Sequence, residues 1–446
     1  MSRSLRMAHA AALLALAATT CATPRAGAES IALVGGTVHT VSGPDIGNAT
    51  VVIRDGKIEA VGATVTPPAD ARVVSCAGKH VYPGFIASNT VLGLTEIASV
   101  RGTNDEQELG TMNPNIRAEV QINPESELIP VARVNGVTSA VVVPRGGAVA
   151  GTSALIHLAG WTFEDMTVQA PLALYVQWPG MTASTDEQRA ARTKAVREIR
   201  DAFEDARAYW KAREAEGKSG IPRHDRDVKW DAMGRALRGE IPVMFRASAL
   251  NQIRAVLAFA DEMKLRRVIL LDGWDAWRIP DEIRKRNIAV ITTGSLDDPQ
   301  RRDEPYDTRY ALPSRLYQAG IPFAIADDGG RDEAALARNL PYHAAMAAAF
   351  GLPREEALKA VTLYPARIFG VDDRLGSIEP GKVADLLVAN GDPLEIATQV
   401  EQVWIAGKEI SMETRHTRLF HKYDEKPRGE HARPRDAAAA GSAGGR

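Results

Sequence analysis

The chain has 446 residues, of which 45% are hydrophobic and 25% are charged, a composition typical of a globular protein. Its formal net charge of -2 excludes the strongly basic surface with which many proteins bind nucleic acid or anionic membranes. This length is sufficient for one large domain and a smaller one.

Residues 1–28 have the three-part pattern of a secretory signal segment. Arginines near the start precede an apolar stretch over residues 7–20, which is too short for an ordinary membrane-spanning helix, and small residues follow it. We therefore predict export to the periplasm or out of the cell, with lipidation at Cys21 as the lesser alternative. Cleavage would leave Cys76 as the only cysteine, so we expect no internal disulfide and, beyond the signal, no membrane span.

Strand-forming segments lie near both ends of the chain. Residues 29–80 include a hairpin that turns at Asp55-Gly56, and residues 383–410 have the same β-rich texture. We predict one β-sandwich domain assembled from residues 29–80 and 373–415.

Between these segments, strand-forming and helix-forming stretches alternate, which is typical of βα units around a parallel sheet. We therefore predict an α/β fold, a (β/α)8 TIM-like barrel over residues 81–372. The eight expected strands are 81–87, 137–143, 154–158, 172–177, 241–247, 267–272, 288–293 and 322–327. Ser184 and Glu187 form a predicted capping box at the start of a long amphipathic helix outside the barrel.

Three further segments have distinctive compositions. Residues 95–135, rich in Asn, Pro and Glu, follow the first barrel strand and are predicted either to cover the active site or to form a surface insertion. The glycine-rich residues 144–153 could cradle an anion or form a tight turn against that insertion. Residues 416–446 are predicted to be a disordered tail.

Residues 81–86, 362–370 and 376–386 carry a resemblance to the amidohydrolase superfamily. The first segment is similar to the entry into the family's first barrel strand, in its imidazolonepropionase-like and dipeptidase-like branches. The other two resemble the passage from the last barrel helix into the β-sandwich. The resemblance implies hydrolysis of amides, cyclic amides and related C–N bonds with one or two divalent metals, usually zinc.

In the family, the metal ligands are a His-x-His pair on strand one, one His on each of strands five and six, often a lysine on strand four, and an Asp at the end of strand eight. Here the corresponding residues are Asn89 and Val91, Arg246, Asp272 and Asp328. Val91 cannot bind a metal, and the neutral oxygen of Asn89 is a poor zinc donor. Arg246 is permanently charged and repels a cation. The sequence therefore argues against the zinc that the resemblance implies.

The same positions suggest a polar pocket. We predict Arg246, Asp272 and Asn89 as substrate-binding residues, with His343 facing the pocket mouth. Asp328 is the candidate general base, with its pKa raised by Asp327 and burial. The alternative is that an ion pair of Arg246 with Asp272 or Asp328 simply fills the space of the missing metal.

Three functions remain open from the sequence. The first is a hydrolase of non-peptide C–N bonds in a small-molecule substrate. The second is a metal-free pseudoenzyme that binds a small acidic or peptide-like ligand or a partner protein. The third is a subunit that assembles with itself or beside an intact paralogue.

Overall fold

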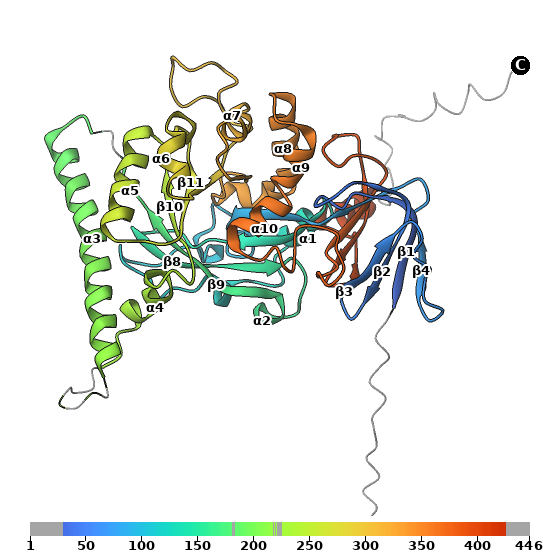
Figure 1. The fold of residues 1–446 in the computed structure, drawn as a ribbon, viewed down its shortest axis with the longest axis horizontal. Coiled ribbons are helices and arrows are strands. Elements are labelled where there is room, and N and C mark those ends of the chain that lie inside the picture. Colours follow the sequence, from blue (N-terminus) through green and yellow to red (C-terminus); the bar gives the residue numbers. More distant parts are fainter. Residues whose placement is uncertain (1–29, 181–182, 217, 219, 221–224, 425–446) are drawn as a thin grey trace, which may run out of the picture.

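The computed structural model describes residues 30–180, 183–216, 218, 220 and 225–424. A barrel-like α/β body and a β-rich domain lie side by side (Figure 1). The predicted signal segment, residues 1–28, and residues 425–446 of the predicted tail lie outside the described residues. No helix in the described ranges is both long enough and apolar enough to cross a membrane.

The β-rich domain contains strands from both ends of the chain, as predicted. Its strands follow the order β16-β15-β14-β5-β1-β2-β3, and β4 pairs with β1. The bounds are β1 (Ile31–Val38), β2 (Ile46–Arg54), β3 (Lys57–Gly62), β4 (Arg72–Ser75), β5 (His80–Pro83), β14 (Leu386–Ala389), β15 (Val400–Ile405) and β16 (Lys408–Ile410). The two ends meet where β5 pairs antiparallel with β14, Pro83 opposite Leu386. The N-terminal part of the domain thus reaches Pro83, slightly beyond the predicted boundary at 80.

The predicted hairpin at Asp55-Gly56 is confirmed, because it joins the antiparallel strands β2 and β3. Asp55 has a φ of 51° and Gly56 a φ of 77°, as a type I′ turn requires of both central residues.

The barrel sheet contains all eight predicted strands in chain order. They are β6 (Phe85–Thr90), β7 (Val137–Val142), β8 (Val149–His157), β9 (Thr167–Gln177), β10 (Val243–Ala247), β11 (Val268–Asp272), β12 (Ala289–Thr292) and β13 (Phe323–Ile325). The prediction of a regular βα repeat is wrong at the third strand, because β8 runs antiparallel to both β7 and β9. A short connection joins β7 to β8, and parallel neighbours would need a much longer crossover.

Helices cover the outside of the barrel (Figure 1). They are α1 (Leu128–Arg133), α2 (Phe163–Met166), α3 (Asp186–Ala215), α4 (Val228–Leu237), α5 (Leu250–Glu262), α6 (Pro280–Arg284), α7 (Leu312–Gln318), α8 (Leu340–Ala349), α9 (Arg354–Lys359) and α10 (Leu363–Phe369). Four 3-10 helices complete them: η1 (Arg101–Thr103), η2 (Ala118–Gln121), η3 (Ala276–Arg278) and η4 (Asp332–Asn339).

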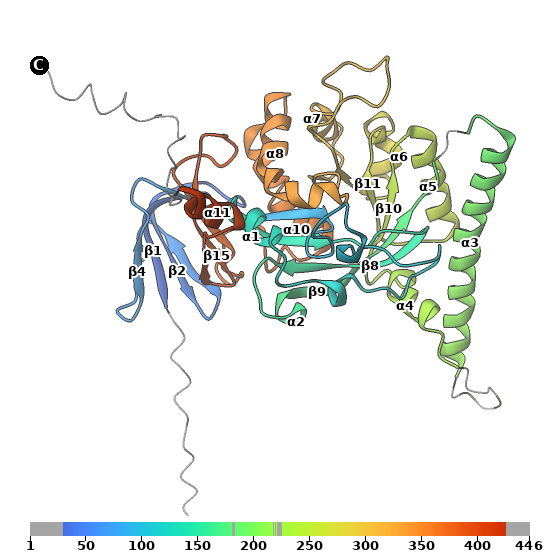
Figure 2. The same ribbon diagram turned by 180° about the vertical axis from the view of Figure 1, so that it is seen from behind.

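Two helix predictions need correction. The capping box of α3 uses Thr185 and Gln188, one residue later than the predicted pair Ser184 and Glu187. The first residues of the predicted disordered tail form a helix, α11 (Arg415–Asp424), which lies beside α1 (Figure 2). An ion pair between Arg418 and Glu127 joins these two helices.

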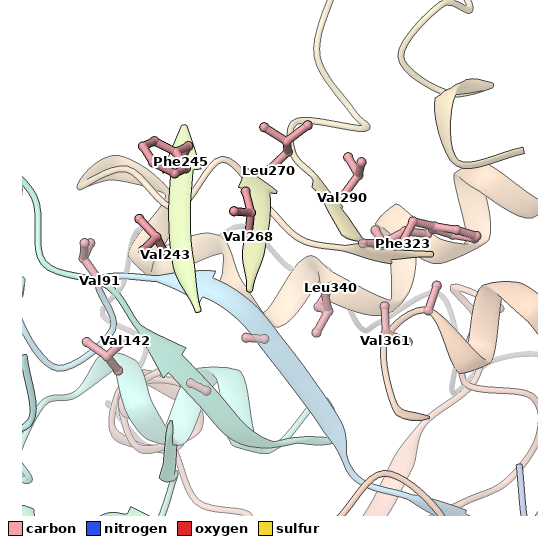
Figure 3. Packing of buried hydrophobic residues seen from close by; sticks show 14 of the residues in the cluster. Val91, Val142, Val243, Phe245, Val268, Leu270, Val290, Phe323, Leu340 and Val361 are labelled. Carbon is pink, nitrogen blue, oxygen red and sulfur yellow. The ribbon is translucent and has the colours of Figure 1, made fainter. Parts of the chain in front are cut away.

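The barrel strands alternate between an inner and an outer apolar layer. Val243 and Phe245 of β10 pack outward with Val268 and Leu270 of β11 (Figure 3). Met244 belongs to the inner layer. Because strand side chains alternate between faces, Arg246 lies on the inner face with Met244.

The insertion, residues 95–135, packs along β8. Residues 112 and 117 pair with residues 149 and 152, and the amides of the glycine-rich segment donate to carbonyls of the insertion. A Cβ on Gly147 would lie 2.7 Å from the carbonyl oxygen of Thr111. Residues 144–148 therefore form a turn packed against the insertion, and residues 149–153 belong to β8. The bonded amides are not free to cradle an anion.

Candidate functional site

Four polar side chains converge at the C-terminal ends of the barrel strands, the end at which barrel enzymes place their active sites. Asn89 is the second-last residue of β6, Arg145 follows β7, Arg246 lies on β10 and Asp328 follows β13. Hydrogen bonds connect Asn89, Arg145 and Arg246 to the loop after β13, which carries Asp328.

Arg246 forms the central ion pair of this cluster. Its Nη2 lies 2.6 Å from Oδ1 of Asp328, and the two side chains are 24% and 35% exposed. Burial lowers the pKa of Arg246, but the hydrogen bond to Asp328 and the charges of Asp328, Tyr175 and Asp272 together outweigh burial, and the net shift is upward. The predicted pairing of Arg246 is thus confirmed, with Asp328 rather than Asp272 as its partner.

Asn89 and Arg145 hold the loop after β13 from the other side. The Asn89 amide donates to the carbonyl of Asp328 at 3.0 Å and accepts from Arg145 Nη2 at 2.7 Å. Arg145 Nη2 also donates to the carbonyl of Gly329 at 2.7 Å. Asn89 therefore positions the backbone of this loop, and its side-chain oxygen is bonded to a guanidinium, whose positive charge disfavours a metal ion beside it.

Sequence reasoning missed Arg145 and Tyr175. The Arg145 guanidinium lies 5.3 Å from the centre of the buried Tyr175 ring, and its Nε and Nη1 have no hydrogen-bond partner in the described part of the chain. Tyr175 lies on the fourth barrel strand, on which the resembled family often has a lysine ligand. The available signal for Arg145 was its position directly after a predicted barrel strand.

Asp327 is the buried carboxyl of the site. Burial raises its pKa to about 8, the nearby charge of Arg145 opposes the shift, and Glu333 and Asp328 add to it. Its Oδ1 has no partner among the described residues. Asp327 consequently holds a proton at neutral pH, whereas Asp328 lies in an ion pair.

Asp272 lies next to the central ion pair. Burial raises its pKa, which the charges of Arg246 and Arg309 oppose, and the Thr293 hydroxyl lies 3.4 Å from its Oδ1. Its φ of 83° is unusual for a residue other than glycine. Backbone of this kind often accompanies functional sites.

The insertion reaches the same loop. Arg331, which follows Asp328 on this loop, pairs with the buried Glu106 of the insertion. Glu106 also accepts a hydrogen bond from the Thr95 hydroxyl at 3.2 Å. The insertion therefore borders the candidate site, which supports its interpretation as a substrate loop over that of an unrelated surface insertion.

Comparisons with known proteins agree with this architecture. A sequence model described as Amidohydrolase family matches residues 302–410. The crystal structure of an amidohydrolase from Thermotoga maritima is 27% identical and superposes with a TM-score of 0.77, over 85% of this chain and 99% of that one. The chain therefore has the fold of amidohydrolase structures and is similar in sequence to the amidohydrolase family.

Two curated relatives within the superfamily match over most of this chain. Amidohydrolase tasK of Hapsidospora irregularis is 24% identical over 373 residues, 76% of this chain and 37% of that protein. The adenine deaminase of Rubrobacter xylanophilus is 23% identical over 416 residues, 87% of this chain and 58% of the relative. The chain thus spans well under two thirds of the length of either relative.

The divalent metal of the superfamily does not fit the residues present. In the described ranges, no group of three or more His, Cys, Asp or Glu residues is placed to hold a metal ion. Arg246 occupies a ligand position and bonds to Asp328. Val91 at another ligand position is fully buried in the outer apolar layer (Figure 3).

His343 does not join the cluster. It lies on α8, buried, and its Nδ1 has no partner in the described part of the chain. Burial alone lowers its pKa to about 4, with no contribution from any of the site's charged groups. A role for His343 at the pocket mouth remains a prediction, and its burial does not favour that role.

Proposed function

We propose that this protein hydrolyses a non-peptide C–N bond, of an amide or cyclic amide, in a small molecule bound at the C-terminal ends of the barrel strands. The observation that carries the proposal is the polar cluster of Arg246, Asp328 and Asp327, which lies where barrel enzymes place their chemistry. The full-length likeness to an amidohydrolase structure supports the reaction class.

The two carboxyls after β13 are suited to different roles, because their environments differ. Asp328 is partly exposed and is the proposed base. Water adds its oxygen to the carbonyl carbon and gives a proton to Asp328. The C–N bond then breaks, and this proton passes to the leaving nitrogen. Asp327 carries its own proton at neutral pH and is proposed to keep a second negative charge away from the attacking water.

The test is amine release from a panel of N-acylated amino acids and cyclic amides, measured with and without a metal chelator. We expect Asp328→Asn to lower kcat/KM by about 100-fold or more, the usual contribution of a general base. Asp332→Asn is the matched control, because Asp332 is an exposed carboxylate close by on the same connection. Equal losses in the two variants would refute the role of Asp328.

A metal-free binding protein is the second candidate, favoured by the absence of a three-ligand metal group in the described ranges. Metal content of the untagged protein, measured by plasma mass spectrometry, separates the possibilities. Stoichiometric metal per chain would contradict the metal-free site. Ligand binding without any turnover in the amide panel would favour the binding protein.

We also propose export, supported by the signal-like pattern of residues 1–28. Fractionation of cells that express the full chain or a chain starting at Ser30 tests this. We expect only the full chain outside the cytoplasm. Assembly with itself or with a paralogue remains a prediction that sedimentation of the purified protein would test.

A further inference from the structure

Arg246, the cation of the central ion pair, is accessible to solvent. Its side chain and that of Asp328 are partly exposed, and they share a single hydrogen bond. Gln177, paired with Arg246 in the sheet register, is exposed as well. A ligand entering the barrel mouth therefore meets Arg246 without passing through the apolar core.

The backbone at Asp328 is held in place, because Asn89 donates to the carbonyl of Asp328 and Arg145 donates to that of Gly329. The partly exposed carboxylate of Asp328 can leave Arg246 by rotation of its own side chain. The Asp328 carboxylate uses one oxygen on Arg246, whereas a guanidinium fork can bind both oxygens of a carboxylate. A free carboxylate could therefore make two bonds where Asp328 makes one.

We propose that the substrate of this site is a carboxylic acid, whose carboxylate displaces Asp328 from Arg246 and thereby frees Asp328 to act as the base. The inference rests on the proposed function, since it names the substrate class of the same site. Hydrolysis and recognition are then coupled, because an amide without a carboxylate leaves Asp328 bound to Arg246.

The second guanidinium favours an anion here. Arg145 lies on the other side of the loop that carries Asp328 and bonds to the Gly329 carbonyl. Its Nε and Nη1 find no acceptor in the described part of the chain, and buried donors without acceptors are costly. Two permanent positive charges thus border this loop, and in the described part of the chain only the Asp328 carboxylate forms an ion pair with either of them.

Calorimetric titration with N-acetylglycine and with N-acetylglycinamide tests the inference, because the two probes differ only in the carboxylate. We expect wild-type protein to bind the acid and not the amide. Arg246→Gln should weaken binding of the acid by about tenfold or more, the value of a charge-assisted hydrogen bond. Asp328→Asn should tighten it by about tenfold, because the competing carboxylate is gone.

The control is Arg254→Gln, which removes an exposed arginine paired with Glu282 on the outside of the barrel. It should leave binding unchanged. Arg246→Gln could lose binding simply because the protein is destabilised. Partial unfolding cannot tighten binding, so the result with Asp328→Asn tests the inference independently. A third titration uses inorganic phosphate, which should bind more weakly than the acid.

Equal binding of the acid and the amide, or weaker binding by Asp328→Asn, would overturn the inference. Tighter binding of phosphate through Arg246 would overturn the carboxylate preference. The titrations need no turnover, so the two proposals fail separately. Carboxylate binding without hydrolysis refutes only the hydrolase, whereas hydrolysis of neutral amides that survives Arg246→Gln refutes only the carboxylate requirement.

Discussion

Two aspartates at opposite ends of the barrel strands show how the same residue type can serve different purposes. Asp385, at the junction with the β-domain, has partners for both oxygens. Oδ1 accepts from the Ala406 amide at 2.8 Å, and Oδ2 accepts from Ser139 and lies 3.1 Å from His157 Nε2. The carboxylate of Asp328, at the other end, is partly exposed, and among the described residues it bonds only to Arg246.

The difference indicates which carboxylate is available for chemistry. A carboxylate whose oxygens are all bonded to the protein fixes geometry, and here it joins two domains. One that retains an oxygen toward solvent can bind a ligand or take a proton. Asp385 is therefore suited to a structural role, and Asp328 is suited to the role of base that we propose for it.

The largest expected effect on stability is the loss caused by removing the Asp385 carboxylate, compared with removal of the Asp328 carboxylate. Asp385→Ala leaves His157 and Ser139 buried without their partner and should lower the free energy of unfolding by about 3–5 kcal/mol. Asp328→Ala breaks a partly exposed pair and should cost about 1 kcal/mol or less. Urea unfolding measures both, and equal losses would remove the distinction between the two ends.

The second prediction concerns Asp327, whose pKa is raised from 3.8 to about 8. A carboxyl with a raised folded pKa contributes stability that is present below pH 4 and is lost as pH rises through 8. Asp327→Asn cannot ionise, so at pH 8 it should be more stable than wild type by at least about 1 kcal/mol. At pH 4 the two proteins should be alike. Thermal unfolding at both pH values tests this, and no difference at pH 8 would contradict a protonated Asp327.

The smallest effect is expected at His157. Burial lowers its pKa, but the charge of Asp385 and the hydrogen bond to it outweigh burial and raise it above 6.5. Its stability contribution is therefore full below pH 6.5 and is lost as pH rises through the folded pKa. His157→Gln should remove about 1 kcal/mol of this pH dependence.

His343→Gln is the matched control for that measurement. The pKa of His343 is lowered to about 4 by burial, so its contribution is lost as pH falls from 6.5 toward 4. Above pH 6.5, the pH dependence of the free energy of unfolding should therefore change in His157→Gln and not in His343→Gln. A response to both variants in that range would contradict the assignment.

Much of the fold could be predicted because it depends on local patterns. The alternation of strand-forming and helix-forming stretches located the eight barrel strands, and the turn at Asp55-Gly56 located a hairpin. The direction of β8 could not be read, since a strand has the same pattern whichever way it runs. The capping box of α3 was one residue off, because Ser184 and Thr185 are each followed three residues later by a suitable partner.

The site was predicted in part for a similar reason. Arg246 and Asp328 lie at the ends of barrel strands, so aligning these strands with those of the resembled family was enough to predict that the two residues are close. Arg145 was missed because its segment was considered only as a glycine-rich anion cradle, and the side chain of Arg145 was not considered. The burial of His343 depends on which side of α8 faces the barrel, which only the tertiary packing decides.

The pairing of β5 with β14 has a consequence for synthesis. Strand β5, which ends at residue 83, has no partner on its β14 side until residue 386 has been synthesised. At a rate of 5–20 residues per second, the ribosome needs roughly 15–60 s to make the intervening chain. During that time β5 presents an open edge, to which another nascent chain could add a strand. Slower translation or truncation before Leu386 should therefore favour aggregation of the newly made protein.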